Sequence, residues 1–378
     1  MKKTILALLA VASISTAATA QNSPLEWESN NTKVKIGGFV RFNINSDFAG
    51  SVSGGNDFIS TNIPTTTDWR DEDYLNFDPS ATRLSMEITQ STEALGDVKV
   101  YVEGDFRGAS NYIPRLRQAY IEAKGVIAGF AWSFMSDLAA NAPTIDINGV
   151  GSRSFLRTQM VGYRRSLGEG LSAGIALEVP TLKSTYAAGY TDLNQTIPNI
   201  PLYIQSKGEA GHIKLSGAIR VLQYGDTSNN QRLDEIGWAG QLSGSLKATT
   251  AITLYGQAIY GQGANNYISD LASQSINMMS TNGTDMESTP MGGASVGIGA
   301  KLSKKWSAAA SGSIAKNYGD EDYFAGSYQS SSYVSAVLFY APAPKISLGV
   351  EYLNGSLTRF GSEAVDAQRL SLSVKYSL

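Results

Sequence analysis

The chain has 378 residues, of which 42% are hydrophobic and 17% charged, and its net charge at pH 7 is −3. It contains no cysteine and one histidine, His212, which excludes disulfides, thiolate nucleophiles and multi-histidine metal sites and argues against a Ser-His hydrolase. Because the net charge is small and the basic residues are spread along the chain, the composition gives no indication of nucleic-acid binding.

The first twenty residues, MKKTILALLAVASISTAATA, have the three parts of an export signal. Two lysines precede an apolar run that ends near Val11, and residues 18–20 match the small-residue pattern cut by signal peptidase. The apolar run is far shorter than the ~20 residues that span a bilayer. We therefore expect a cleaved signal peptide at 1–20, a short N-terminal tail at 21–32 and a single barrel domain at 33–378.

From residue 33 onward, apolar and polar residues alternate in segment after segment. This period is typical of a strand with one dry and one wet face. In DVKVYVEGDFRG (97–108), three valines share one face, and Lys99, Tyr101, Glu103, Asp105 and Arg107 share the other. Sixteen such strands are predicted, at 33–47, 83–92, 97–108, 114–124, 126–136, 156–166, 170–180, 199–208, 212–224, 235–247, 252–263, 292–302, 306–317, 329–341, 345–356 and 368–378.

The lengths of these strands and of their connections favour a membrane barrel over a soluble sandwich. Strands of globular domains average about 5–6 residues, whereas a transmembrane strand requires about 9–11. Short turns alternate with longer connections at 48–82, 109–113, 137–155, 181–198, 225–234, 264–291, 318–328 and 357–367. Outer-membrane barrels combine short periplasmic turns with longer outer loops in this way. We predict an all-β fold, a 16-stranded antiparallel transmembrane β-barrel.

The charged face of each strand must then be the inner one. A charge on the lipid face costs roughly 2–4 kcal/mol near the bilayer midplane, so one misplaced charge per strand would exceed the stability of a domain. A barrel of sixteen strands has room for an aqueous lumen, whereas eight strands fill theirs with side chains. The polar faces are therefore expected to line a water-filled hole.

Four stretches in residues 79–165 are similar to a known family. PSATRLSMEI, GDVKVYVEGDFRG, RLRQAYIEAKGVIAGFAWSFMSD and TIDINGVGSRSFLRTQMVGYR, in this order, resemble the DcaP-like family of outer-membrane porins. The resemblance implies a homotrimeric channel that lets small hydrophilic solutes diffuse passively, with a preference for anions such as dicarboxylates. It also implies a third outer loop, 137–155, folded into the pore, and contact with outer-membrane lipid and lipopolysaccharide.

Selectivity in such a pore depends on its diameter and on rings of charge. Arginine suits an anion path because it stays charged and pairs bidentately with carboxylates. We expect a basic wall formed by Lys35, Arg41, Arg83, Lys99, Arg107, Arg115, Arg117, Arg153 and Arg157, with the acids Glu87, Glu103, Asp105 and Asp146 facing it. The face of Arg157 is ambiguous, since it lies opposite Arg164 by alternation. Whether the acids meet the solute or only hold the arginines stays open.

Other interpretations have weaker support. The acidic loop 68–78, DWRDEDYLNFD, is a calcium candidate but lacks EF-hand spacing, so we expect a solvated loop without a metal. We predict no cofactor and no enzyme activity, and we interpret His212 as a turn residue because it closes EAGH. An outer-membrane phospholipase or protease and a structural or adhesive barrel with partner-binding loops are the alternatives. The chain is too short for a TonB-dependent transporter, which needs a plug and about twenty-two strands.

Overall fold

The computed structural model describes residues 25–52, 56–65, 73–108, 112–283 and 285–378. The expected signal peptide, 1–20, lies outside these residues. None of the helices in the described part is long and apolar enough to cross a membrane.

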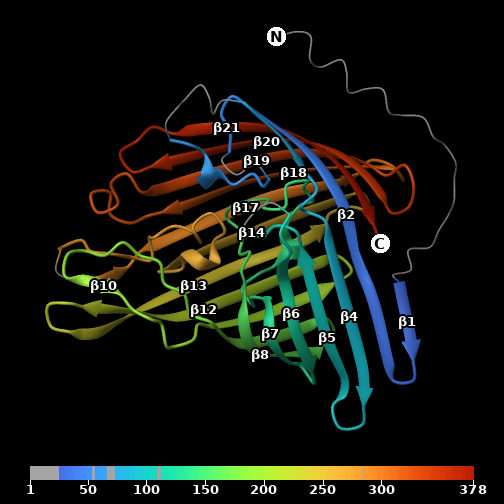
Figure 1. Cartoon of the computed structure of the whole chain (residues 1–378), viewed down its shortest axis with the longest axis horizontal. Helices are drawn as coiled ribbons and strands as arrows, with labels where there is room; N and C mark the ends of the chain where they lie inside the picture. Colours follow the sequence, from blue (N-terminus) through green and yellow to red (C-terminus); the bar gives the residue numbers. More distant parts are fainter. Residues whose placement is uncertain (1–24, 53–55, 66–72, 109–111, 284) are drawn as a thin grey trace.

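The described residues form a closed antiparallel β-barrel (Figure 1). The sheet has nineteen strands, and sixteen remain once the short additions β1, β3 and β10 are set aside. Each of the sixteen pairs with its neighbours along the chain, and β2 pairs with β21 from Phe39–Ser377 to Phe48–Gln368 to close the ring. The predicted fold class is confirmed.

The wall strands agree closely with the predicted segments. They are β2 (Thr32–Phe48), β4 (Arg83–Thr92), β5 (Gly96–Asp105), β6 (Arg115–Ala123), β7 (Val126–Trp132), β8 (Arg157–Gly168), β9 (Leu171–Glu178), β11 (Ile200–Gly208), β12 (Gly211–Asp226), β13 (Gln231–Lys247), β14 (Ile252–Gln262), β17 (Pro290–Lys301), β18 (Trp306–Asn317), β19 (Tyr328–Tyr340), β20 (Ile346–Arg359) and β21 (Val365–Ser377). Two outer connections, 227–230 and 360–364, are shorter than expected because the flanking strands continue as hairpins.

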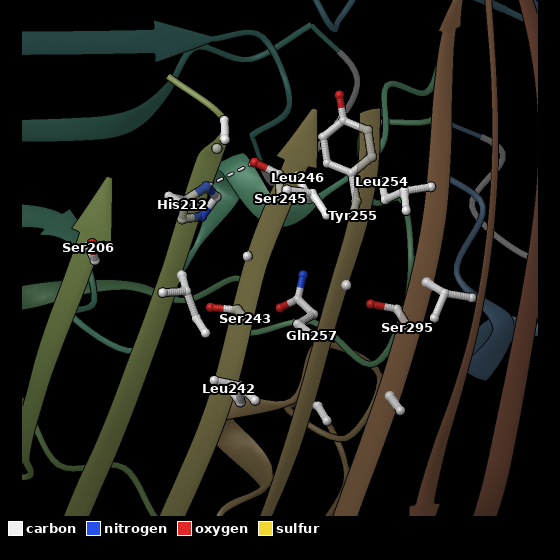
Figure 2. Close-up of a pocket in the computed structure, with 18 of the residues that line it drawn as sticks. Ser206, His212, Leu242, Ser243, Ser245, Leu246, Leu254, Tyr255, Gln257 and Ser295 are labelled. Atoms are coloured by element: carbon white, nitrogen blue, oxygen red, sulfur yellow. Dashed lines mark hydrogen bonds between the residues drawn. The ribbon is translucent and has the colours of Figure 1, made fainter. Parts of the chain in front are cut away.

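The alternation along these strands separates an apolar outer face from a polar inner one. On β13, Leu242 and Leu246 are exposed, whereas Ser243 between them is buried inside the barrel. Figure 2 shows this alternation on β13 and β14, where Leu242, Leu246 and Leu254 alternate with Ser243, Ser245 and Gln257. The exposed leucines and Val296 line a shallow apolar groove on the outer wall. This face is the one suited to lipid.

Short elements add to the wall and the loops. β1 (Leu25–Ser29), in the segment expected to be a tail, pairs with β2 from Leu25–Ile36 to Ser29–Thr32. It finds this edge free because β21 pairs with β2 only from Phe39 onward. The other short elements are β3 (Tyr74–Asp78), β10 (Tyr190–Asp192), the hairpin of β15 (Met278–Met279) and β16 (Glu287–Ser288), and the 3-10 turns η1 (Ser60–Asn62), η3 (Leu138–Ala140) and η4 (Asn265–Tyr267).

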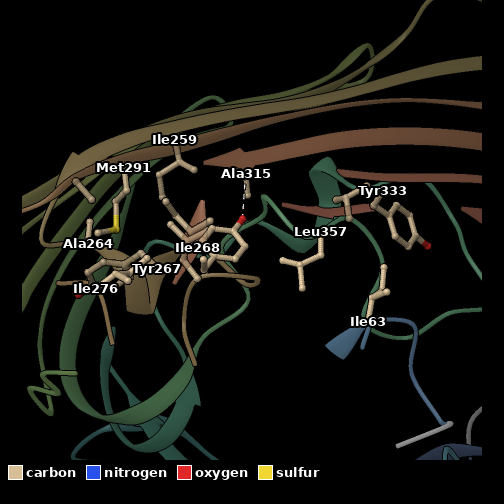
Figure 3. Packing of buried hydrophobic residues seen from close by; sticks show 14 of the residues in the cluster. Ile63, Ile259, Ala264, Tyr267, Ile268, Ile276, Met291, Ala315, Tyr333 and Leu357 are labelled. Atoms are coloured by element: carbon tan, nitrogen blue, oxygen red, sulfur yellow. Dashed lines mark hydrogen bonds between the residues drawn. The ribbon is translucent and has the colours of Figure 1, made fainter. Parts of the chain in front are cut away.

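The main apolar core lies inside the barrel rather than between layers. The described parts of three outer loops contribute residues to it: loop 1 (49–82), whose β3 pairs with β2 in the wall, loop 3 (133–156) and loop 6 (263–289). In Figure 3, Tyr267 and Ile268 of loop 6 pack near Ile259 and Met291 of the wall. Leu357, Tyr333 and Ile63 extend the same cluster. The sequence did not predict this core. It fills part of the lumen, so the path for solutes lies in the part that remains.

The outer face of β5 and the inner face of the adjacent β4 give a test of the barrel. Val100→Lys places a charge on the lipid face and should lower the free energy of unfolding by about 2–4 kcal/mol. Ser85→Lys, on the inner face of the adjacent β4 and opposite Glu103, should cost much less. Urea unfolding in lipid vesicles measures both, and equal losses would contradict the assignment of faces.

Candidate functional site

Loop 3 crosses the lumen and is tied at its start to the strands β12 and β13. Asp137 Oδ2 lies 2.8 Å from His212 Nε2 and accepts a hydrogen bond of 2.7 Å from Ser243. Lys214 donates to the backbone oxygen of Ser136 over 2.7 Å. His212 also contacts Ser245, as the dashed line in Figure 2 shows, over 2.9 Å. The interpretation of His212 as a turn residue is therefore wrong, because it holds loop 3 to the wall.

The tip of loop 3 is tied to the opposite wall. The backbone N–H of Asp146 donates to Glu351 of β20 over 2.7 Å, and the carboxylate of Asp146 accepts a hydrogen bond from the backbone N–H of Phe58 in loop 1 over 3.0 Å. Arg41 of β2 donates to the backbone oxygen of Ile145. The loop thus spans the barrel between two fixed ends, and the predicted inward fold of the third loop is confirmed.

Loop 6 packs directly on loop 3. The backbone N–H groups of Ser269 and Asp270 donate to the backbone oxygens of Arg153 and Gly151 over 3.0 and 2.9 Å. A Cβ on Gly151 would lie 2.0 Å from the carboxylate of Asp270, so only glycine allows this approach. Ser331 of β19 donates to the same carboxylate over 2.6 Å. The two loops therefore form one buried unit on this side of the lumen.

The inner faces of β2, β4, β5 and β6 bring together most of the predicted site residues. Arg117 contacts Glu103 and Asp105, each over 2.7 Å. Arg115 makes a two-pronged contact with Asp105, over 2.9 and 2.7 Å, and Arg83 lies 3.7 Å from Glu103. Farther along the wall, Lys99 pairs with Glu87 over 2.7 Å, and Lys35 lies 3.5 Å from Glu26 of β1.

Members of this group differ sharply in exposure. The side chain of Arg117 is 2% exposed, whereas that of Arg115, two residues earlier, is 37% exposed. Glu103 and Asp105 are buried between the arginines. In this wall the two acids hold arginines in place and present little surface to the lumen.

Within the described residues, the other predicted site residues form no ion pair with this wall. Arg107 pairs with Asp57 and Asp78, which ties loop 1 to the end of β5. Arg153 is buried within loop 3, donates to Ile147 and stacks 3.6 Å over the ring of Phe155. Arg157 shares its face of β8 with the exposed Val161 and Tyr163, but its guanidinium lies over Trp132 and donates to the backbone oxygen of Arg117 over 3.1 Å.

Two further observations concern residues that the sequence left aside. Asp47 and Arg369, on the neighbouring strands β2 and β21, form a buried ion pair that the sequence analysis did not name. In the acidic loop 68–78, residues 68–72 lie outside the described residues, and Asp78 is bound to Arg107 and Ser80. No cluster of metal-ligating residues occurs in the part of the chain that the structure describes.

The contrast between Arg117 and Arg115 gives a stability test. Arg117→Met leaves two buried carboxylates short of a partner and should lower the free energy of unfolding by about 3–5 kcal/mol. Arg115→Met, at a half-exposed position, should cost about 1 kcal/mol or less. Urea unfolding of the two variants measures the difference, and similar losses would show that Arg117 is not a structural residue.

Burial raises the pKa of Asp270 in loop 6 to about 6. The hydrogen bond from Ser331 and the charge of Arg153 lower this pKa, but burial has the larger effect. In the packed loop the Asp270 carboxyl therefore keeps its proton up to about pH 6, whereas in an open loop it loses this proton near pH 4. The packing of loop 6 weakens as the pH rises through about 6. We expect the amides of Ser269 and Asp270 to be better protected from hydrogen exchange at pH 5 than at pH 7.5, after correction for chemical exchange.

Asp270→Asn removes this titration and should reduce the difference between the two pH values. Part of the difference will remain, because burial and the charge of Asp57 also raise the pKa of Asp146 to about 6. An unchanged pH dependence in Asp270→Asn would rule out Asp270 as its source.

Comparison with known proteins agrees with this geometry. The DcaP outer-membrane channel of Acinetobacter baumannii superposes with a TM-score of 0.81 at 21% identity, covering 93% of this chain and 99% of that one. An anion-selective porin of Comamonas acidovorans gives a TM-score of 0.60 at 10% identity, covering 92% of this chain and all of the other. The trimer form of OmpT from Vibrio cholerae gives 0.58 at 9% identity, with coverage of 92% and 100%.

At these identities the superpositions show the fold, and they confirm the resemblance to DcaP at that level. No curated protein matches the chain in sequence. A family model described as "Porin subfamily" matches residues 30–377, which is nearly the whole chain. The chain therefore belongs to the porin subfamily and forms an outer-membrane channel.

Proposed function

We propose that this porin lets small hydrophilic solutes diffuse passively across the outer membrane and that it prefers anions, including dicarboxylates. The observation that carries the proposal is the unequal exposure of the charged side chains on the inner faces of β2, β4, β5 and β6. The side chains of Lys35, Lys99 and Arg115 are 40%, 31% and 37% exposed. Those of Glu103 and Asp105 are 9% and 2% exposed. A solute passing this wall therefore meets more positive than negative surface.

The mechanism follows from this distribution of charge. Exposed cations in a cleft with low-dielectric walls raise the local concentration of anions. Two acids of this group are partly exposed: Glu87, paired with Lys99, and Glu26, paired with Lys33 and Lys35. Their pairing limits their effect. The start and the tip of loop 3 are tied to the wall, so the loop keeps its place in the path. The solute moves down its own gradient through this path, without energy coupling.

Assembly and export complete the proposal. We infer a homotrimer in contact with outer-membrane lipid and lipopolysaccharide, in line with the trimer form of OmpT, an outer membrane protein of Vibrio cholerae with the same fold. We also infer that residues 1–20 are removed on export. A structural or adhesive role is the competing function, and it requires no conductance.

Ion selectivity in a planar bilayer tests the proposal. In a salt gradient the purified protein should give a reversal potential of the sign of an anion channel. The double variant Lys99→Gln/Arg115→Gln should move this potential towards zero, because it removes two of the exposed positive charges. Lys304→Gln/Lys345→Gln, which changes the same charge in two periplasmic turns, serves as the control and should keep most of the selectivity.

Folded protein that conducts no current would overturn the porin proposal. Cation selectivity would leave the channel intact and contradict the assignment of the basic wall.

A further inference from the structure

A second basic site lies apart from the wall described above, on the periplasmic side of loop 3. A cavity of about 290 Å³ is bounded by Thr144 of loop 3 and by inner-face residues of β18, β19, β20, β21 and β2. Three cations line it: Arg41, Lys305 and Lys375. Lys305 lies in the short turn between β17 and β18, which places the cavity towards the periplasmic mouth.

Two of these cations face each other directly. Arg41 and Lys375 are cross-strand partners in the β2–β21 pairing that closes the barrel. Like charges directly opposite each other on neighbouring strands are destabilising. Among the described residues, neither forms an ion pair with a carboxylate, and Lys305 forms none either. The cations of the cavity thus have no carboxylate in direct contact, in contrast to Arg117 and Arg369, and the charges of Glu351 and Asp146 act on Arg41 only from beyond the cavity.

Arg41 is oriented for a ligand. Its Nε donates to Asn43 and Ser373 over 3.0 and 3.2 Å, and one terminal nitrogen donates to Ile145 of loop 3. These contacts, within the described residues, leave the other terminal nitrogen for a ligand. A guanidinium held in this way binds carboxylate or phosphate oxygens without losing side-chain freedom.

The third cation stands at the other end of the cavity. Lys305 precedes β18, whereas Lys375 lies on β21, so three strand spacings, roughly 14 Å of wall, separate their backbones. The hydroxyls of Ser347, Ser373 and Thr144 line the space between them. Glu351, the next inward-facing residue beyond Gly349 on β20, is held by the backbone of Asp146 and does not line the cavity.

We propose that this cavity is a binding site for a small solute with two or more negative charges, which it holds at the periplasmic end of the path. The inference rests on the proposed function, because the channel brings the solute to the cavity. It adds the class of anion and the residues that hold it. Three cations without a carboxylate in direct contact favour a multivalent anion over a monovalent one, because each added charge pairs with a separate group. Phosphate-bearing and polycarboxylate solutes share this chemistry.

Isothermal titration of the folded protein in detergent with pyrophosphate, succinate and acetate tests the site. We expect saturable binding of pyrophosphate and succinate and weak binding of acetate. The double variant Lys305→Gln/Lys375→Gln should weaken pyrophosphate binding by at least about tenfold, since the loss of 1.4 kcal/mol corresponds to this factor. Lys304→Gln/Lys345→Gln carries the same change in net charge, and neither of its residues lines the cavity, so binding should stay within about twofold of the original.

Each other outcome overturns the proposal. These are the absence of pyrophosphate binding, acetate binding of equal strength, and equal losses in the two double variants, which would indicate a general field. If Lys375→Gln prevents folding, Lys305→Gln alone, in an exposed turn, provides the test and should still weaken binding. Titration does not depend on conductance, so a protein that binds pyrophosphate but carries no current would contradict the porin function alone.

Discussion

The backbone of the wall strands has no water to bind in the hydrocarbon of a membrane, and the rest of the structure depends on this constraint. Each unpaired N–H or C=O group there costs several kcal/mol, so a sheet that spans the membrane must close on itself. The pairing of β2 with β21 meets this condition. It also brings Arg41 opposite Lys375 and Asp47 opposite Arg369, residues that lie over 300 positions apart in sequence. The charge pattern of the lumen is thus a consequence of closure.

The charges inside fall into two groups according to their partners. Arg117, Arg107 and Arg369 are buried and bound to carboxylates, which offsets the cost of removing them from water. Arg220 is buried too, but it donates to backbone carbonyls and to the amide oxygens of Asn199 and Asn277. The arginines bound to carboxylates fix the loops and the wall and add little to the field in the lumen. The field comes from the cations that stay partly exposed and from those, such as Arg220 and Arg41, whose hydrogen bonds within the described residues go to neutral acceptors.

The sequence predicted the wall well because the prediction rests on a local rule. Alternation decides the face of a residue from its neighbours alone, so Lys99, Glu103 and Asp105 could be assigned to the inner face without a structure. Burial within that face is not local. Arg115 and Arg117 lie on one strand two residues apart, yet only Arg115 is substantially exposed. The difference depends on loops and on the irregular pairing of β5 with β6 after Glu103, which no sequence pattern specifies.

The loops were predicted less well for the same reason. The inward position of loop 3 followed from a family resemblance, whereas loop 6 was treated as an ordinary outer loop. Its buried residues Tyr267, Ile268, Leu271 and Ile276 are a signal that the sequence contains, since an outer loop in water has little use for four large apolar side chains. The cavity of Arg41, Lys305 and Lys375 left no such signal, because its members meet only through the register of the closed barrel.

A passive channel must attract its solute without retaining it, and the pairing of the lumen arginines is consistent with this requirement. Conduction needs binding that is favourable enough for entry and weak enough for release. If every arginine of the wall were exposed and unpaired, an anion would be held too tightly to move on. Glu103 and Asp105 offset the positive charge of the buried Arg117, while Arg115 and Lys99 still face the solute. The same carboxylates that stabilise the wall therefore also set how strongly it binds, so that stability and permeation are adjusted by one set of residues.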